Sequence, residues 1–86
     1  MYQVTISSKA EKHFSKLPKN LQEKVAKKLK QLEENPFQAR LDIKKLTGTQ
    51  KSYRLRVGEL RIIYQINNSS KEIFVVDIDF RRTTTY

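Results

Sequence analysis

The first third of the chain contains one short alternating segment and two segments with helical spacing. Residues 2–6 alternate weakly and are rich in strand-favouring residues, so we expect a first strand there. Ser8 and Glu11 match a capping box, which predicts a short helix with Ser8 as its N-cap, ending near residue 17 before Pro18. The inward positions of this helix are then Ala10, Phe14 and Leu17.

A longer amphipathic helix is predicted next. Asn20 and Glu23 repeat the capping signal, and helical spacing continues to about residue 34. Asn35 precedes Pro36 and ends the helix, because the residue before proline disfavours helical backbone angles. Four apolar residues recur at helical spacing and form the stripe that should face the core: Leu21, Val25, Leu29 and Leu32.

The second half of the chain alternates with the period of β-strands. Residues 53–66 predict a hairpin around Gly58-Glu59, since glycine at the first central position suits a two-residue type II′ turn. The turn sets an apolar face in which Val57 is opposite Leu60, Leu55 opposite Ile62, and Tyr53 opposite Tyr64. A short strand is an option near residues 43–46. A last strand is expected over residues 73–80, with Phe74, Val76, Ile78 and Phe80 on one side.

These elements predict an α+β fold with the order β-α-α-β-β-β. The helix pair comes first, so we expect an antiparallel sheet covered on one face by an N-terminal helix hairpin, with the other face open. The 86 residues suffice for one small domain, residues 1–86, with a modest core.

The hairpin's second face carries like charges in opposition. Arg56 is predicted opposite Arg61, with Arg54 opposite Ile63, although directly opposed like charges destabilise a strand pair. Plausible registers put Asp77 or Asp79 opposite Arg61, and Arg81 would point to the same side. An anionic partner lying between the arginines would explain this pattern.

Charge and composition narrow the class of partner. The net charge of +9 favours nucleic acid or an acidic protein segment. Ten of the twelve lysines lie in residues 1–50, whereas five of the six arginines lie in residues 54–82, where planar guanidinium groups suit bidentate phosphate contact. There is no cysteine, no metal-ligand cluster and no apolar run of the roughly 20 residues that span a bilayer. We therefore expect a cytoplasmic protein with no metal, no cofactor and no membrane partner.

Four segments together resemble the RelE/ParE toxin superfamily of toxin–antitoxin systems. They are KLP at residues 16–18, KLTGT at 45–49, YRLRVGELRIIYQI at 53–66 and VVDIDFRRTTTY at 75–86. The resemblance covers nearly the whole chain and implies a toxin neutralised by a cognate antitoxin. In the RelE branch, such toxins cleave messenger RNA on the ribosome. In the ParE branch, they inhibit DNA gyrase, which leaves a binding module without nuclease activity as the alternative.

The resemblance also implies site residues. The family's functional positions are basic residues, which fall on Arg54, Arg56 and Arg61 and on Arg81 or Arg82 in the tail, and a late tyrosine, which falls on Tyr86. We also expect Lys45 and Lys51 to contact RNA. Relatives often have lysine at the positions of Arg54 and Arg56, and arginine is not a credible general base.

Three other titratable residues receive structural interpretations. Asp77 and Asp79 are expected to be counter-ions for Arg61. His13 is expected on the first helix, remote from the arginines. The expected chemistry is therefore metal-independent attack of the RNA's own 2′-OH, giving a 2′,3′-cyclic phosphate, with Tyr86 left as the candidate for proton transfer or base stacking.

Overall fold

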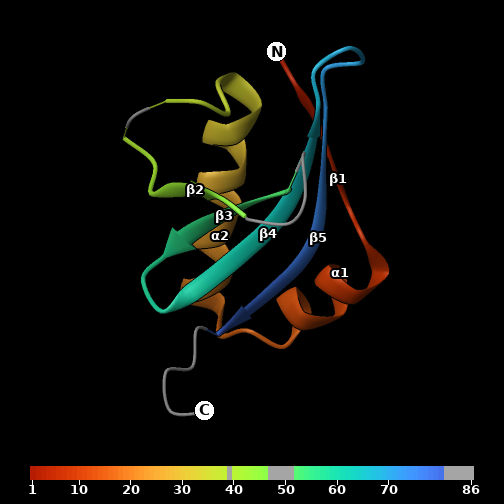
Figure 1. Cartoon of the computed structure of the whole chain (residues 1–86). Helices are drawn as coiled ribbons and strands as arrows, with labels where there is room; N and C mark the ends of the chain where they lie inside the picture. Colours follow the sequence, from red (N-terminus) through yellow and green to blue (C-terminus); the bar gives the residue numbers. More distant parts are fainter. Residues whose placement is uncertain (39, 47–51, 81–86) are drawn as a thin grey trace.

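The computed structural model describes residues 1–38, 40–46 and 52–80 (Figure 1). Within these residues, an α+β fold contains two helices and a five-stranded mixed sheet. The elements in chain order are β1 (Gln3–Ile6), α1 (Ser8–Ser15), α2 (Lys19–Glu34), β2 (Ile43–Lys45), β3 (Ser52–Val57), β4 (Leu60–Asn67) and β5 (Glu72–Phe80).

The sheet is mixed, so the expectation of a purely antiparallel sheet was wrong. The strand order is β1-β5-β4-β3-β2, and β1 pairs with β5 in parallel, with Val4 opposite Ile73. The other three pairings are antiparallel. A parallel pair needs a long connection, and both helices and three strands separate β1 from β5 in the chain. Alternation within residues 2–6 carries no information about which distant strand they join.

Both helix caps differ from the expectation. Ser7, not Ser8, caps α1: its Oγ accepts the amide hydrogen of Ala10 at 3.0 Å and donates to the carbonyl of Val76 at 2.7 Å. The second bond ties the helix start to β5, a contact 69 residues away that no local pattern reveals. α2 begins at Lys19 after Pro18, without a side-chain cap.

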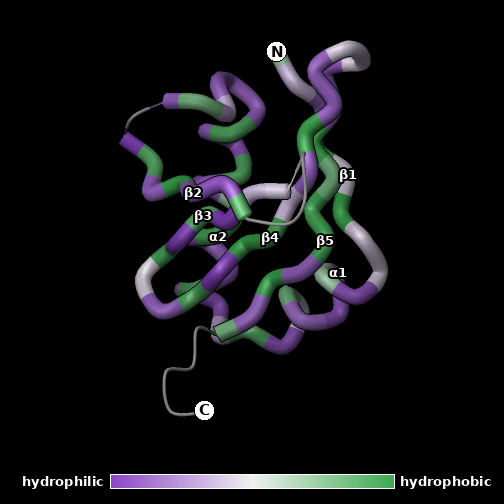
Figure 2. Tube along the Cα trace, in the orientation of Figure 1, coloured by the Kyte–Doolittle hydropathy of each residue, from purple (hydrophilic) through white to green (hydrophobic). Residues whose placement is uncertain are grey.

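The core lies between the helices and one face of the sheet. Figure 1 shows α2 behind the sheet and α1 beside β5, and Figure 2 shows hydrophobic and hydrophilic residues alternating along the strands. The apolar stripe predicted for α2 is buried at Val25, Leu29 and Leu32. The buried apolar residues come from the helices, the strands and, for Leu41, the segment before β2: Ala10, Val25, Leu29, Leu32, Leu41, Leu55, Val57, Leu60, Ile62, Tyr64, Ile66, Ile73, Val75 and Ile78.

The β3–β4 hairpin has the predicted turn and register. Gly58 has φ +60°, whereas Glu59 has no positive φ, as a type II′ turn requires. The three predicted apolar pairs all occur, and Arg56 is opposite Arg61 with Arg54 opposite Ile63. Local turn chemistry was therefore sufficient to set this register.

β5 contains a β-bulge that the alternating pattern did not predict. Ile63 of β4 is opposite Asp77, whereas Tyr64 is opposite Val75, so Val76 is the extra residue. The bulge changes which residues face the core: Val75 and Ile78, three positions apart, are both buried. The predicted grouping of Phe74, Val76, Ile78 and Phe80 on one side was therefore wrong. Phe74 is instead exposed on the face away from the core, in register with Gln65.

Candidate functional site

The open face of the sheet gathers charged residues from four strands and the segment before β2. Residues directly opposite in a ladder point to the same side, so the register defines the rows of this face. One row runs Arg56, Arg61, Asp79 across β3, β4 and β5. The next row runs Lys44, Arg54, Ile63, Asp77 across β2 to β5. We call this surface the arginine face; its charged members are Asp42, Lys44, Arg54, Arg56, Arg61 and Asp79.

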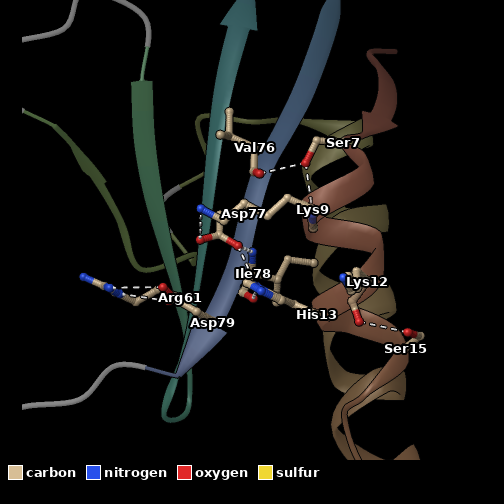
Figure 3. A network of polar contacts seen from close by, with 11 residues as sticks. Ser7, Lys9, Lys12, His13, Ser15, Arg61, Val76, Asp77, Ile78 and Asp79 are labelled. Carbon is tan, nitrogen blue, oxygen red and sulfur yellow. Dashed lines mark hydrogen bonds and ion pairs between the residues drawn. The ribbon is translucent and has the colours of Figure 1, made fainter.

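Arg61 is held by Asp79, the residue opposite it in β5. The Arg61 Nε donates to Oδ1 at 3.3 Å, and Nη2 donates to Oδ2 at 3.4 Å (Figure 3). The side chains are 35% and 33% exposed, so the pair is still in contact with solvent. Of the two aspartates expected as counter-ions for Arg61, Asp79 is therefore the one that contacts it. The two-point contact fixes the plane of the guanidinium group.

Asp42, which sequence reasoning missed, lies beside the other two arginines. Its Oδ1 is 3.6 Å from Arg54 Nη2, and its Oδ2 is 3.6 Å from Arg56 Nε. Its backbone carbonyl also accepts the amide hydrogen of Arg56 at 3.0 Å. Asp42 precedes β2 in a connecting segment, and only the pairing of β2 with β3 brings it here. The side chain is 56% exposed, and both distances are long for an ion pair, so this contact is weak.

Arg54 and Arg56 have unused hydrogen-bonding capacity. The Nε atom of each is buried without a hydrogen-bond partner among the described residues. The Arg54 side chain is only 14% exposed, so its guanidinium group is held in a narrow range of positions. The arginine face has four cationic side chains against the two carboxylates of Asp42 and Asp79. The third carboxylate of its rows, Asp77, contacts Lys9 and His13 of α1 instead. An excess of positive charge is therefore available to an anion.

Register places Lys44, rather than Lys45, on the arginine face. Lys44 is opposite Arg54, whereas Lys45 is opposite Tyr53, whose side chain packs against the core. Neighbouring residues of a strand point to opposite sides, so Lys45 lies on the other face of the sheet. That Lys45 contacts RNA stays a prediction, and such a contact would lie on the opposite face of the sheet from the arginines.

His13 lies on α1, as expected, and its ring contacts β5. Its Nδ1 lies 2.9 Å from Asp77 Oδ1 and 3.1 Å from the carbonyl oxygen of Ile78 (Figure 3). Both neighbours are acceptors when the carboxylate is ionised, so Nδ1 carries the hydrogen. Lys9 Nζ lies 3.5 Å from Asp77 Oδ2. Asp77 therefore interacts with α1 rather than with Arg61, and His13 occupies the edge of β5 beyond the end of β1.

Four residues predicted for the site, Lys51, Arg81, Arg82 and Tyr86, lie outside the described residues. Among the residues that the structure describes, no group of three or more His, Asp or Glu side chains is placed to hold a metal ion. No helix in that part of the chain is both long and apolar enough to cross a bilayer.

Comparisons with known proteins agree on the family. The family of ParE toxins of type II toxin–antitoxin systems (parDE) matches residues 4–84. A RelE-like toxin protein of Escherichia coli is 35% identical over 82 residues, which cover 93% of this chain and 83% of the relative.

Solved structures agree with these sequence matches. The archaeal RelE–RelB complex from Pyrococcus horikoshii OT3 contains a chain that is 30% identical with a TM-score of 0.84, over 96% of this chain and 98% of that one. The intact E. coli RelBE toxin–antitoxin complex contains one that is 26% identical with a TM-score of 0.79, over 95% and 99%. The chain therefore belongs to the RelE/ParE toxin superfamily of type II toxin–antitoxin systems.

Proposed function

We propose that this protein is a messenger RNA endoribonuclease that acts together with the ribosome. The observation that supports this function best is the arginine face, where Arg54, Arg56 and Arg61 project from adjacent strands with Lys44 beside them. The cations outnumber the carboxylates around them, and arginine suits bidentate contact with phosphate. A sheet built only for stability would not place Arg56 opposite Arg61.

The proposed reaction is intramolecular attack on the RNA phosphate. The 2′-OH oxygen forms a bond to the adjacent phosphorus, and the bond from phosphorus to the 5′ oxygen of the next nucleotide breaks. The 2′ proton leaves to a base, and the departing 5′ oxygen takes up a proton. The products are a 2′,3′-cyclic phosphate and a 5′-OH. This route needs the strand to be held bent and the charge on the non-bridging oxygens to be stabilised.

Arg61 is assigned to the non-bridging oxygens. Its guanidinium plane is already fixed by Asp79, so little reorganisation is needed when charge develops on the phosphate. One such donor typically contributes about 2.7–4 kcal/mol of barrier reduction. Arg81 or Arg82 is proposed as the second donor. Arg54 and Arg56 grip flanking phosphates, and Lys51 is proposed as a further phosphate contact.

Proton transfer needs a group other than the arginines of this site. Arginine is effectively always protonated, so Arg54, Arg56 and Arg61 cannot serve as general bases. Tyr86 is the proposed candidate for proton transfer or for stacking on a base. Without a well-placed base the protein should cleave free RNA slowly and depend on the ribosome to bend the strand, which is why the ribosome is part of the proposal.

We propose that the cognate antitoxin competes with RNA for the positively charged arginine face. The relatives of known structure include toxins solved as RelE–RelB complexes. An antitoxin segment with acidic and apolar residues would neutralise part of the +9 charge. Binding of such a segment over the arginine face would exclude RNA.

The function is tested by mapping message ends in a translation extract. The intact protein should generate new 5′ ends within translated messages, and Arg61→Ala should reduce their yield by about 10²–10³-fold. Lys27→Ala, which removes one positive charge from an exposed position on α2, is the matched control and should cleave normally. Deletion of Tyr86 tests the tail in the same assay. Intact messages with the wild-type protein would overturn the proposal.

A second candidate function is inhibition of DNA gyrase without nuclease activity. The match of residues 4–84 to the ParE toxin family supports it. A supercoiling assay with purified gyrase separates the two candidates: a nuclease leaves supercoiling unchanged at concentrations that arrest translation, whereas a gyrase inhibitor blocks it and leaves messages intact.

A further inference from the structure

A second feature of the open face lies beyond the arginines, on β4 and β5. Phe74 of β5 is 42% exposed and is opposite Gln65 of β4. The β-bulge at Val76 is responsible, because it puts Phe74 and Asp77 on the same face although they are three residues apart. The exposed ring therefore lies on the sheet surface that also bears Arg54, Arg56 and Arg61.

A hollow of about 320 Å³ adjoins this ring. It is lined by Gln65, Ile66, Asn67, Glu72 and Phe74. Except for Ile66, these residues alternate onto the open face, as the register pairs Gln65 with Phe74 and Asn67 with Glu72. An apolar ring next to an amide and a carboxylate is a combination that suits a flat ligand with polar edges.

The polar groups around the hollow have capacity left for a ligand. Asn67 Oδ1 accepts the amide hydrogens of Ser69 and Ser70 at 3.0 and 3.2 Å, which leaves its NH₂ group to donate. One carboxylate oxygen of Glu72 accepts from the Ser70 hydroxyl at 2.8 Å. The other is available to accept from the amino edge of a base. No side-chain hydrogen bond joins Gln65 to another described residue.

We propose that Phe74 and the hollow beside it form a nucleobase-binding subsite for single-stranded RNA. This inference rests on the proposed function, since the RNA backbone must lie on the arginine face. Gln65 and Arg61 are four residues apart on β4, about 13 Å along the strand, so one extended RNA strand reaches both. Single-stranded RNA is recognised by stacking of its bases on aromatic side chains and by hydrogen bonds to their edges.

Charge complementarity favours RNA over an acidic protein segment at this position. Glu72 carries a negative charge in the hollow, which would repel an acidic peptide. A base itself is uncharged, and its phosphates can lie toward the positive arginine rows. The arrangement thus separates the two halves of a nucleotide: the backbone at the arginines and the base at Phe74.

The subsite is tested with short single strands of 2′-O-methyl RNA, which lack the free 2′-OH needed for cleavage. One fluorescent 2-aminopurine is moved through the sequence, and its quenching reports stacking. With the wild-type protein, quenching should be strongest at one position of the strand. Phe74→Ala should remove that maximum and weaken binding by about 5- to 150-fold, the range expected for one stacked base.

Two matched variants distinguish the effect of ring stacking from the effect of side-chain size. Phe74→Trp keeps an aromatic surface and should retain the quenching maximum. Phe74→Leu keeps an apolar side chain without a ring and should lose it. All variants should melt like the wild type, since the side chain is 42% exposed. If quenching and affinity are the same with alanine, leucine and tryptophan, the subsite does not exist.

The same assay distinguishes failure of this inference from failure of the proposed function. Binding that is weakened by Arg56→Ala but not by Phe74→Ala overturns the subsite and leaves RNA as the ligand of the arginine face. Absence of RNA binding by the wild-type protein overturns both. If Phe74→Ala weakens only binding of the cognate antitoxin, the occupant is a protein and the inference is wrong.

Discussion

The two faces of the β3–β4 hairpin are made by alternate residues of the same two strands, but only one of them contributes much to the stability of the fold. On the core face, Leu55, Ile62 and Tyr64 are fully buried. On the open face, Arg56 is opposite Arg61, and both side chains are only about two-thirds buried. The core face stabilises the sheet by removing apolar area from water. The open face gains little, because its ion pairs remain in contact with solvent.

The difference shows how a small sheet separates folding from binding. The turn at Gly58 fixes the register, and the buried pairs fix it again. Once the register is set by one face, the residues of the other face are held at defined spacings whatever their own interactions contribute. A row of like charges can therefore persist, provided that partial counter-ions such as Asp42 and Asp79 lie beside it.

Neighbouring substitutions on β4 provide the largest test of this comparison. Ile62→Ala should lower the free energy of unfolding by about 2–5 kcal/mol, because it leaves a cavity at a fully buried position. Arg61→Ala, one residue away, should lower it by less than about 1 kcal/mol, since its ion pair is about one-third exposed. Urea denaturation monitored by circular dichroism measures both. Similar losses for the two variants would contradict the division between the faces.

Tyr64 is a polar exception on the core face and gives a medium effect. Its hydroxyl is buried without a hydrogen-bond partner among the described residues, and its ring stacks on Tyr53 with centroids 5.8 Å apart. Tyr64→Phe should therefore raise the free energy of unfolding by about 1–3 kcal/mol at neutral pH. If the variant is less stable than the wild type, the hydroxyl has a stabilising partner.

The same tyrosine predicts a pH dependence. Burial raises the pKa of the Tyr64 phenol, and the nearby Tyr53 raises it further. The folded state therefore holds this proton more tightly than the unfolded state, whose phenol has a pKa of about 10. The stability that this tighter proton binding gives the folded state is fully present below pH ~10 and is lost as the pH rises toward the pKa of the folded state. Only the wild type carries this phenol, so the stability advantage of Tyr64→Phe should grow above pH ~10 and stay constant below it.

The smallest effect concerns Asp42 on the open face. Its carboxylate lies 3.6 Å from both Arg54 and Arg56, where it would compete with an RNA phosphate for the two guanidinium groups. Asp42→Asn should tighten binding of 2′-O-methyl single-stranded RNA by up to about fivefold, as expected for loss of a weak, exposed ion pair. The gain should shrink at high salt. Glu34→Gln makes the same change of charge at the exposed end of α2 and is the control. Equal gains from both would indicate a general charge effect.

Features defined by nearby residues were predicted well. The hairpin register followed from Gly58-Glu59, and the apolar stripe of α2 followed from helical spacing. Both depend on backbone geometry that a few adjacent residues decide. The helix caps were less well predicted, because the Ser7 hydroxyl is also held by Val76 of β5, far away in the chain.

Features that join distant segments were not predicted. The parallel pairing of β1 with β5, the bulge at Val76 and the approach of Asp42 to Arg54 all depend on how whole elements pack. One extra residue in β5 is enough to move Phe74 onto the open face, and alternation alone cannot reveal where a ladder skips a residue.

The sequence by itself determined the elements, the hairpin register and the presence of opposed arginines, because turn geometry and side-chain periodicity are local properties of the chain. Only the tertiary structure decided which carboxylates accompany those arginines, that Lys44 rather than Lys45 joins them, and that an aromatic ring shares their face. These relations depend on strand order and register between segments far apart in sequence, which are set by burial of the common core.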